Sequence, residues 1–182
     1  QIKLYDGVTT EEIDEALIIS ARSKIEKEPD YSYAAARLLL GTIYKEVFGE
    51  DPREDLKDQY EACFKANLQA LIDYKLIDPR LSEQFDLDRL ASALKPERDL
   101  KFKYLGLQTV YDRYLVHIRK RRMETPQAFF MRVAMGLALN EDDREARAIE
   151  FYEVLSNFYA LSSTPTLFNS GTTHPQLSSC FL

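Results

Sequence analysis

Cys180 is the residue of this sequence with the greatest capacity for chemistry. It ends the run Gln176-Leu-Ser-Ser-Cys180, which follows a loop rich in glycine and proline. A thiol reacts as its thiolate, so a cysteine in such a place can act as a nucleophile or exchange electrons as half of a disulfide. Cysteines in strand-like sequence are also common packing residues. From the residues alone, both redox work and packing stay open for Cys180.

A second candidate is the cluster of hydroxyl side chains around Pro165. Ser162, Ser163, Thr164 and Thr166 surround this proline directly after a predicted helix. Small hydroxyl groups and free backbone N–H groups near a turn suit phosphate oxygens. Turns are built from the same residue types, so the cluster is consistent with an anion site or with a plain turn.

The other reactive side chains lie where structural roles are expected. Cys63 falls on the apolar face of a predicted helix, which is typical of a buried, unreactive thiol. His117 and His174 are not at metal-ligand spacing from each other or from a cysteine, so we expect no metal site. The sequence also lacks a glycine-rich phosphate loop, a G-x-S-x-G turn and a paired-carboxylate signature.

The composition indicates a globular protein. Of 182 residues, 45% are hydrophobic and 30% are charged, which is enough for a sizeable core. The formal net charge of −6 disfavours a broad nucleic-acid footprint. No apolar run approaches the roughly 20 residues that cross a bilayer, and no signal peptide opens the sequence. Two cysteines do not make a disulfide framework, which favours a reducing, cytoplasmic setting. From the charge and the lack of long apolar runs, we expect no nucleic-acid or membrane partner.

Helical periodicity organises the first 160 residues. Thr9 and Glu12 have the spacing of a capping box, and a helix is predicted from about Thr10 to Lys27. Pro29 and Asp30 restart the chain into a second helix that ends at Gly49. The two helices are predicted to form a hairpin, and residues 49–52 are the best candidate domain boundary.

Further helices are predicted beyond this boundary. One amphipathic helix follows residue 56 and has a single polar interruption, Asn67, in its apolar stripe. Thr125 is expected to cap another helix, with Pro126 at its first position. The remaining predicted helices cover residues 88–94, 101–115 and from about 140 or 142 to 159, and the 101–115 stripe includes Leu105, Leu107, Val110, Tyr111 and Tyr114.

Two stretches depart from this helical pattern. The basic run Arg119-Lys-Arg-Arg122 is consistent with a solvated linker or helix end, or with contact to a phosphate or a partner surface. From Ser163 onward the pattern changes to short extended pieces broken by Pro165, Gly171 and Pro175. The sequence begins and stops within structured-looking segments, so we expect it to be a piece of a longer chain.

The last twenty residues carry a family resemblance. Ser163-Thr-Pro-Thr-Leu-Phe-Asn-Ser-Gly-Thr172, followed by Gln176-Leu-Ser-Ser-Cys180, resembles the large (α, catalytic) subunit of class I ribonucleotide reductases. The likeness continues upstream over nearly the whole chain, in four further segments: Tyr5-Asp-Gly7 with Thr10, Pro29-Asp-Tyr31, Ala35-Ala-Arg-Leu38 and Glu124-Thr-Pro-Gln127.

The resemblance implies a mainly α fold in three parts. Residues 1–48 are similar to the second, helical half of an ATP-cone. Residues 50–161 are similar to the N-terminal helical domain of the reductase large subunit. Residues 162–182 are similar to the beginning of the catalytic α/β barrel and reach its first strand.

The resemblance also implies roles for single residues. Cys180 matches one cysteine of the redox pair that reduces the ribose, its partner lying beyond this chain. Thr164 and Ser179 match residues that contact the substrate, the threonine near the diphosphate. Thr10 and Lys45 fall where an ATP-cone contacts its ATP or dATP effector. Because the first half of the cone is absent and Tyr44 stands where a basic residue can occur, nucleotide binding by this cone stays open.

For the whole enzyme, the resemblance implies reduction of ribonucleoside diphosphates to deoxyribonucleoside diphosphates. It implies a small (β) subunit with a dinuclear metal radical site, thioredoxin or glutaredoxin as reductant, and a large-subunit homodimer. We expect no cofactor in this part of the chain and no activity from it alone. Two alternatives are an adenosylcobalamin-dependent (class II) reductase and a helical regulatory or interaction module without chemistry.

Overall fold

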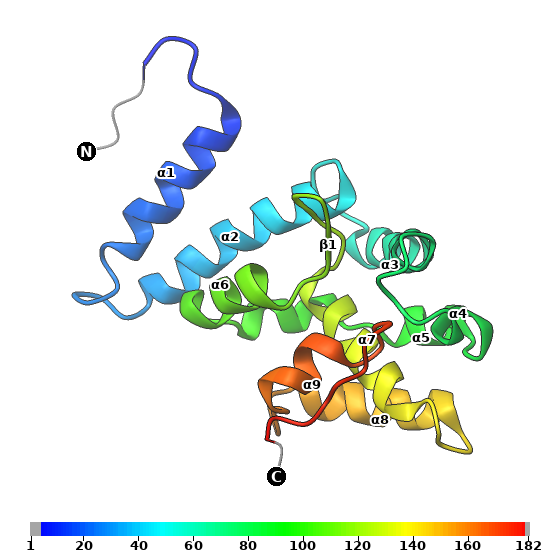
Figure 1. Cartoon of the computed structure of the whole chain (residues 1–182). Helices are drawn as coiled ribbons and strands as arrows, with labels where there is room; N and C mark the ends of the chain where they lie inside the picture. The colour runs from blue at the N-terminus through cyan, green and yellow to red at the C-terminus, as the bar shows by residue number, and fades with distance from the viewer. Residues whose placement is uncertain (1–4, 181–182) are drawn as a thin grey trace.

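The computed structural model describes residues 5–180, which fold into a body of packed helices with a projecting helical arm (Figure 1). The helices are α1 (Thr10–Arg22), α2 (Tyr31–Phe48), α3 (Leu56–Asp73), α4 (Arg80–Glu83), α5 (Leu87–Ala93), the 3-10 helix η1 (Pro96–Lys101), α6 (Tyr104–Arg113), α7 (Pro126–Ala138), α8 (Arg144–Ser156) and α9 (Thr164–Asn169). A hairpin of β1 (His117–Ile118) and β2 (Arg121–Arg122) is the one sheet in the described residues. The expectation of a mainly α fold is confirmed.

Local sequence signals determine the α1–α2 hairpin. Thr9 Oγ1 accepts from the Glu12 backbone N–H, and the Glu12 carboxylate accepts from the Thr9 N–H, so the predicted capping box is present. Gly49 ends α2 in the left-handed conformation, with φ 77°. The predicted end of α1 near Lys27 is wrong, because α1 stops at Arg22 and a series of turns leads into Pro29.

The predicted helix over 101–115 is divided in the structure. Residues 96–101 form η1, and α6 begins only at Tyr104. Between them Phe102 is extended, which brings its ring into a stacked pair with Phe130 at 6.2 Å between centroids. Leu105, expected on the apolar stripe, is 75% exposed, whereas Leu107 is fully buried. Residues two apart on a helix face different directions, so both could not face the core.

The basic run forms the β1–β2 hairpin instead of a linker or helix end. Arg119 at its turn has φ 57°. The Arg121 guanidinium donates to the carbonyls of Glu46 (2.9 Å) and Val47 (3.1 Å). These are among the last carbonyls of α2, which lack partners within the helix. Arg121 therefore caps a helix end and is not available as a free phosphate contact.

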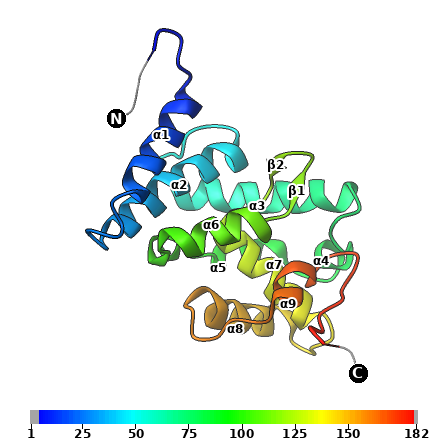
Figure 2. The same cartoon turned by 60° about the vertical axis from the view of Figure 1, so that its left-hand side comes forward.

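Helix α7 is the centre of the body. Eleven of its thirteen residues are buried, so it is covered on all sides rather than along one stripe. It packs on α8, η1 and α9, and Figure 2 shows it beside α8 and α9. Its buried aromatic pair contacts neighbouring segments: Phe129 stacks on Tyr114, and Phe130 packs against Phe102 and Phe158. Burial of each phenylalanine contributes about 2 kcal/mol.

Helix α2 belongs to the same core as the residues after Gly49. It packs on α6, η1 and β2 as well as on α1. Leu39, Ile43 and Val47 are at most 4% exposed. The predicted domain boundary at residue 49 stays a prediction, and the contacts of α2 with α6, η1 and β2 cross it. None of the described helices has the length and apolar composition needed to cross a membrane.

A buried carboxylate joins five elements. Asp99 on η1 has no exposed surface, and its Oδ2 accepts from the hydroxyls of Tyr44 (2.6 Å) and Tyr60 (2.5 Å). Its Oδ1 accepts from Gln127 Nε2 at 2.8 Å, and Gln127 in turn accepts from the Tyr152 hydroxyl at 2.8 Å. These bonds link η1 with α2, α3, α7 and α8. Burial raises the pKa of Asp99 to about 6, although the three donors oppose this change.

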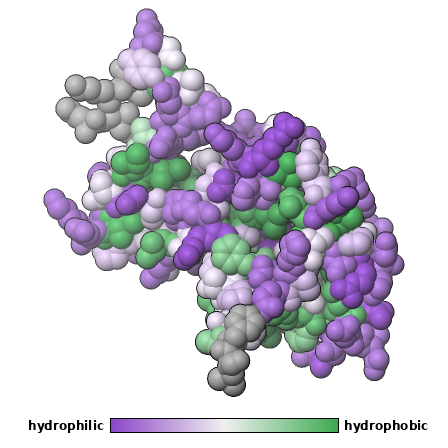
Figure 3. Space-filling view, viewed as in Figure 1, coloured by the Kyte–Doolittle hydropathy of each residue, from purple (hydrophilic) through white to green (hydrophobic). Residues whose placement is uncertain are grey.

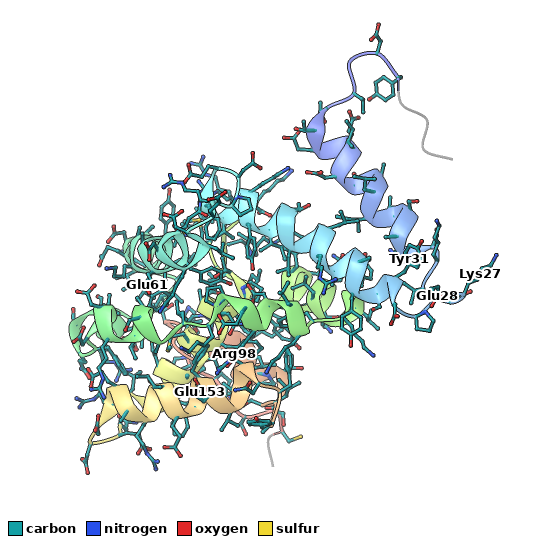
Figure 4. The ribbon with its side chains drawn as sticks, turned by 180° about the vertical axis from the view of Figure 1, so that it is seen from behind. Lys27, Glu28, Tyr31, Glu61, Arg98 and Glu153 are labelled. Carbon is teal, nitrogen blue, oxygen red and sulfur yellow. The ribbon has the colours of Figure 1, made fainter. Side chains whose placement is uncertain are left out.

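A second, partly exposed contact secures η1 on α8. Figure 4 shows Arg98 of η1 beside Glu153 of α8, and the two form an ion pair at 2.6 Å. Arg98 also donates to the Ser156 hydroxyl at 2.7 Å. On the face seen in Figure 3, hydrophilic side chains predominate and hydrophobic residues are exposed in separate patches.

We expect Asp99→Asn to remove a pH dependence of folding that the native chain shows between about pH 4 and about pH 7. Because the folded-state pKa is raised, protonation of Asp99 favours the folded state. This contribution is full below the ordinary pKa and is lost as the pH rises through about 6. The unfolding free energy of the native chain minus that of the variant should fall by about 3 kcal/mol over this interval.

Urea unfolding at a series of pH values measures this difference. Other carboxylates titrate alike in both proteins, so the comparison isolates Asp99. A difference that stays constant with pH would show that the residue does not bind a proton in the folded chain.

Candidate functional site

The hydroxyl cluster around Pro165 starts a short helix, α9, rather than the extended pieces expected from the sequence. Pro165 lies in the first turn, where a missing N–H costs nothing because that group has no partner within the helix. Ser163 precedes the helix in an extended conformation, and its hydroxyl lies 3.4 Å from that of Thr166. The side chain of Thr164 is exposed, and its hydroxyl lies 3.3 Å from the Tyr114 hydroxyl.

The chain after α9 pairs with the loop that follows α3. Thr172 forms an antiparallel bridge with Ile77. Gly171 accepts from the Asp78 N–H at 3.0 Å, and the Thr173 N–H donates to Leu76 at 3.2 Å. Residues 173–180 form no strand in the described part of the chain. The first barrel strand therefore stays a prediction.

The segment that ends at Cys180 runs back past α9 (Figure 1). Thr166 Oγ1 donates to the Leu177 carbonyl at 3.2 Å, and Asn169 Nδ2 donates to the Gln176 carbonyl at 2.6 Å. These two bonds position the backbone directly before the predicted site residues, and both donors come from α9. The helix therefore orients the segment.

Cys180 and Ser179 are exposed to solvent. The Ser178 hydroxyl donates to the Cys180 carbonyl at 3.1 Å, and the Ser179 hydroxyl lies 3.9 Å from the Cys180 sulfur. The redox role and the packing role of Cys180 both stay predictions. Thr164, Ser179 and Cys180 thus lie on two segments that the bonds from α9 hold together.

A buried ion pair anchors this unit to the body. Arg132 on α7 is 1% exposed, and its Nε donates to Glu124 Oε1 at 2.6 Å. Its Nη1 donates to the Ser170 carbonyl at the end of α9, also at 2.6 Å. Glu124 accepts from the Val116 N–H at 2.8 Å. Removing one partner of such a pair costs about 3 to 5 kcal/mol, because a charge is left buried without compensation.

Two glycines allow α7 and the end of α9 to approach this closely. A Cβ on Gly136 would overlap the backbone nitrogen of Gly171 and the Ser170 hydroxyl. Gly171 has φ 77°, and a Cβ there would lie 2.9 Å from the Arg132 carbonyl. The Ser170 hydroxyl donates to the Val133 carbonyl at 2.8 Å. Backbone contact between α7 and residues 170–171 thus positions α9.

An apolar hollow of about 530 Å³ adjoins Thr164. Aromatic side chains from α7 and from the segments that follow η1, α6 and α8 contribute to its wall, with lysines also among the lining residues: Phe102, Tyr114, Phe129, Phe130, Phe158, Lys101 and Lys103. Thr164 therefore lines an apolar hollow in addition to opening α9.

The predicted effector residues Thr10 and Lys45 meet in a different hollow, between α1, α2 and α6. This effector hollow has a volume of about 800 Å³. Lys45 Nζ lies 3.0 Å from Asp14 Oδ2 and 3.7 Å from Asp51 Oδ1. The hydrogen bond and charge of Asp14 raise the pKa of Lys45. The structure thus brings the two predicted residues together, with Lys45 already bound to carboxylates.

The remaining sequence candidates have structural or solvent-exposed positions. Cys63 is half-buried and donates to the Val47 carbonyl at 3.6 Å, and burial raises its thiol pKa to about 11. Asn67, the polar interruption of the α3 stripe, donates to the Met123 carbonyl at 3.0 Å. His117 and His174 are exposed, and no cluster of metal-ligating side chains occurs within residues 5–180.

Arg132 and Asp99 were not singled out from the sequence. Arg132 is the sole charged residue within α7, whose other residues are mostly apolar. A charge within an apolar helix indicates a buried partner, because burial of an unpaired charge is prohibitive. That signal could have predicted a pair for Arg132, but not the identity of Glu124 or the contact to Ser170.

Comparison with known proteins agrees with the family resemblance found in the sequence. The family model described as "Ribonucleotide reductase, all-alpha domain" matches residues 100–175. The chain is 51% identical to the ribonucleoside-diphosphate reductase subunit alpha of Chlamydia muridarum, over 98% of this chain and 17% of that protein. It is 43% identical to the ribonucleoside-diphosphate reductase subunit alpha of Helicobacter pylori (strain ATCC 700392 / 26695), over 100% of this chain and 22% of that protein. It is 38% identical to the ribonucleoside-diphosphate reductase large subunit of Danio rerio, over 98% of this chain and 22% of that protein.

The chain therefore spans 17% to 22% of the length of these curated relatives.

We expect Gly136→Ala to displace the segment that carries Cys180, because the added methyl group overlaps the backbone of Gly171. Overpacking of this kind costs about 3 kcal/mol. Urea unfolding measures the loss, and limited proteolysis should show faster cleavage within residues 171–180. Gly41→Ala is the matched control, since nothing lies within 4 Å of a Cβ there and α2 should gain about 0.5 to 1 kcal/mol. Equal effects of Gly136→Ala and Gly41→Ala on unfolding and proteolysis would contradict the close approach of α7 to Gly171.

Proposed function

From the premise that this chain belongs to the ribonucleoside-diphosphate reductase large-subunit family, we propose that Cys180 is one thiol of the pair that reduces the ribose. The observation that supports this role is that two hydrogen bonds from α9, the helix that begins at Thr164, hold the segment that ends at Ser179 and Cys180. We propose that the substrate is a ribonucleoside diphosphate. Thr164 and Ser179 would both contact it, Thr164 near the diphosphate.

The proposed reaction consumes two thiols. The C2′–OH bond of the ribose breaks, the hydroxyl leaves as water, and a C2′–H bond forms. The two electrons come from a pair of thiols that becomes a disulfide. Cys180 supplies one sulfur of this pair, and the second lies outside residues 1–182. Cys63 is unsuited to that role, because a thiol with a pKa of about 11 contains little thiolate at neutral pH.

The proposal includes the partners of the family. A small subunit with a dinuclear metal site would supply the radical, thioredoxin or glutaredoxin would reduce the disulfide, and two large subunits would form a dimer. We propose class I rather than an adenosylcobalamin-dependent reductase, on the ATP-cone-like start of the chain and the segment Glu124-Thr-Pro-Gln127. A cobalamin requirement of the complete enzyme would overturn that choice.

We further propose an effector contact at Thr10 and Lys45. Both residues line the effector hollow between α1, α2 and α6, which is large enough for a nucleotide. Lys45 would bind a phosphate of ATP or dATP through its ammonium group.

In the complete subunit, we expect Cys180→Ser to abolish multiple turnover, with activity lower by at least about 100-fold. A hydroxyl cannot form the disulfide that supplies the two electrons. Steady-state formation of deoxyribonucleotide measures the loss, and binding of the nucleoside diphosphate should be retained. Cys63→Ala is the control and should leave turnover unchanged. Continued cycling of the Cys180→Ser enzyme would refute the redox role.

We expect the 182 residues alone to show no turnover. Their two cysteines are the exposed Cys180 and the half-buried Cys63, which is bonded to the backbone of α2. Incubation with a ribonucleoside diphosphate and dithiothreitol, followed by chromatography of the products, tests this expectation. Deoxyribonucleotide formed by the isolated chain would contradict it.

A further inference from the structure

The ion pair between Lys45 and Asp14 lies inside the effector hollow. Lys45 extends from α2 and Asp14 from α1, and the two charged groups are 3.0 Å apart. Their side chains are 45% and 34% exposed, so the pair is accessible to a ligand in solution. Asp51 approaches Lys45 from the loop after α2, at 3.7 Å, with 81% of its side chain exposed. Asp14 is thus the closer and less exposed of the two partners.

The charges around this pair are mainly negative. Five carboxylates and two cations line the hollow: Glu11, Asp14, Glu15, Glu46 and Asp112, against Arg22 and Lys45. Two of the carboxylates are already engaged. Glu46 accepts from the Tyr111 hydroxyl and the Arg122 N–H, and Asp112 accepts from Gln108. Glu11, Asp14 and Glu15 lie within two turns of α1 and face a common space.

We propose that Asp14 is the residue that decides whether the effector hollow accepts a nucleotide triphosphate. Its carboxylate occupies the position at Lys45 Nζ that a phosphate oxygen would take. The proposal rests on the effector role suggested above for Lys45, and it adds a competing group within the chain itself.

The competition follows from the chemistry of an ammonium group. Lys45 is a point charge with three donors, and in this structure one carboxylate is bonded to it and a second lies nearby. A triphosphate must either displace Asp14 from Lys45 or bind Lys45 beside the negative charge of Asp14. Both costs become smaller when the Asp14 carboxylate is replaced by a neutral amide of the same shape.

The test compares Asp14→Asn with Glu15→Gln in the 182-residue chain. Both changes remove one negative charge from the wall of the hollow, but Glu15 forms no ion pair among residues 5–180. Equilibrium dialysis with ATP, and separately with inorganic triphosphate, measures binding at low ionic strength. We expect Asp14→Asn to bind both ligands about fivefold more tightly than the native chain, and Glu15→Gln less than about twofold more tightly.

Replacement of Lys45 separates this proposal from the effector role. In the Asp14→Asn background, Lys45→Met should abolish the gain in affinity. If it does not, Lys45 is not the phosphate contact and the effector role fails. If Lys45→Met weakens binding but Asp14→Asn and Glu15→Gln behave alike, the effector role stands and the competition by Asp14 is refuted. Absence of binding in every variant would overturn both.

Discussion

The buried pair of Arg132 and Glu124 is the interaction on which the candidate site depends. It places a fixed guanidinium in the centre of the body, and one of its donors is directed to the Ser170 carbonyl. That carbonyl belongs to the end of α9, so the helix that bears Thr164 is positioned by a charge on α7. Such a pair contributes less to net stability than to geometry, because desolvation of both groups offsets much of their attraction. Only one arrangement satisfies all their hydrogen bonds.

A second buried network connects the rest of the body to the same helix. Asp99 binds Tyr44 from α2 and Gln127 from α7, five residues before Arg132. The segment of residues 124–127, which resembles the reductase family, therefore serves both networks: Glu124 in one and Gln127 in the other. Within the described residues, every buried side-chain nitrogen or oxygen atom has a hydrogen-bond partner. Their directional bonds make the packing of the helices specific.

The two candidate regions differ in their chemistry. The segment that ends at Cys180 presents a thiol and hydroxyl groups to solvent, beside a hollow with aromatic walls. Among the residues that line the effector hollow, carboxylates outnumber cations, and its one lysine is bonded to Asp14. The first arrangement is the one for which we propose substrate contact and thiol exchange. In the second, an anionic ligand has to compete with the protein's own charges.

The sequence by itself determined the features that depend on near neighbours. The Thr9–Glu12 capping box, the stop at Gly49 and the start at Pro126 each follow from the conformational preferences of a few consecutive residues. The motif around Cys180 was recognisable for the same reason, since its residues are contiguous. Family resemblance could therefore be read from short segments without knowledge of their packing.

Tertiary structure alone decided which distant groups meet. Arg132 and Ser170 are 38 residues apart, Tyr44 and Asp99 are 55 apart, and Asp14 and Lys45 are 31 apart. No helical period relates such positions, because each pair depends on how whole helices cross. The burial of Asp99 follows from the same long-range packing. A local pattern shows that a side chain needs a partner, and only the packed chain selects that partner.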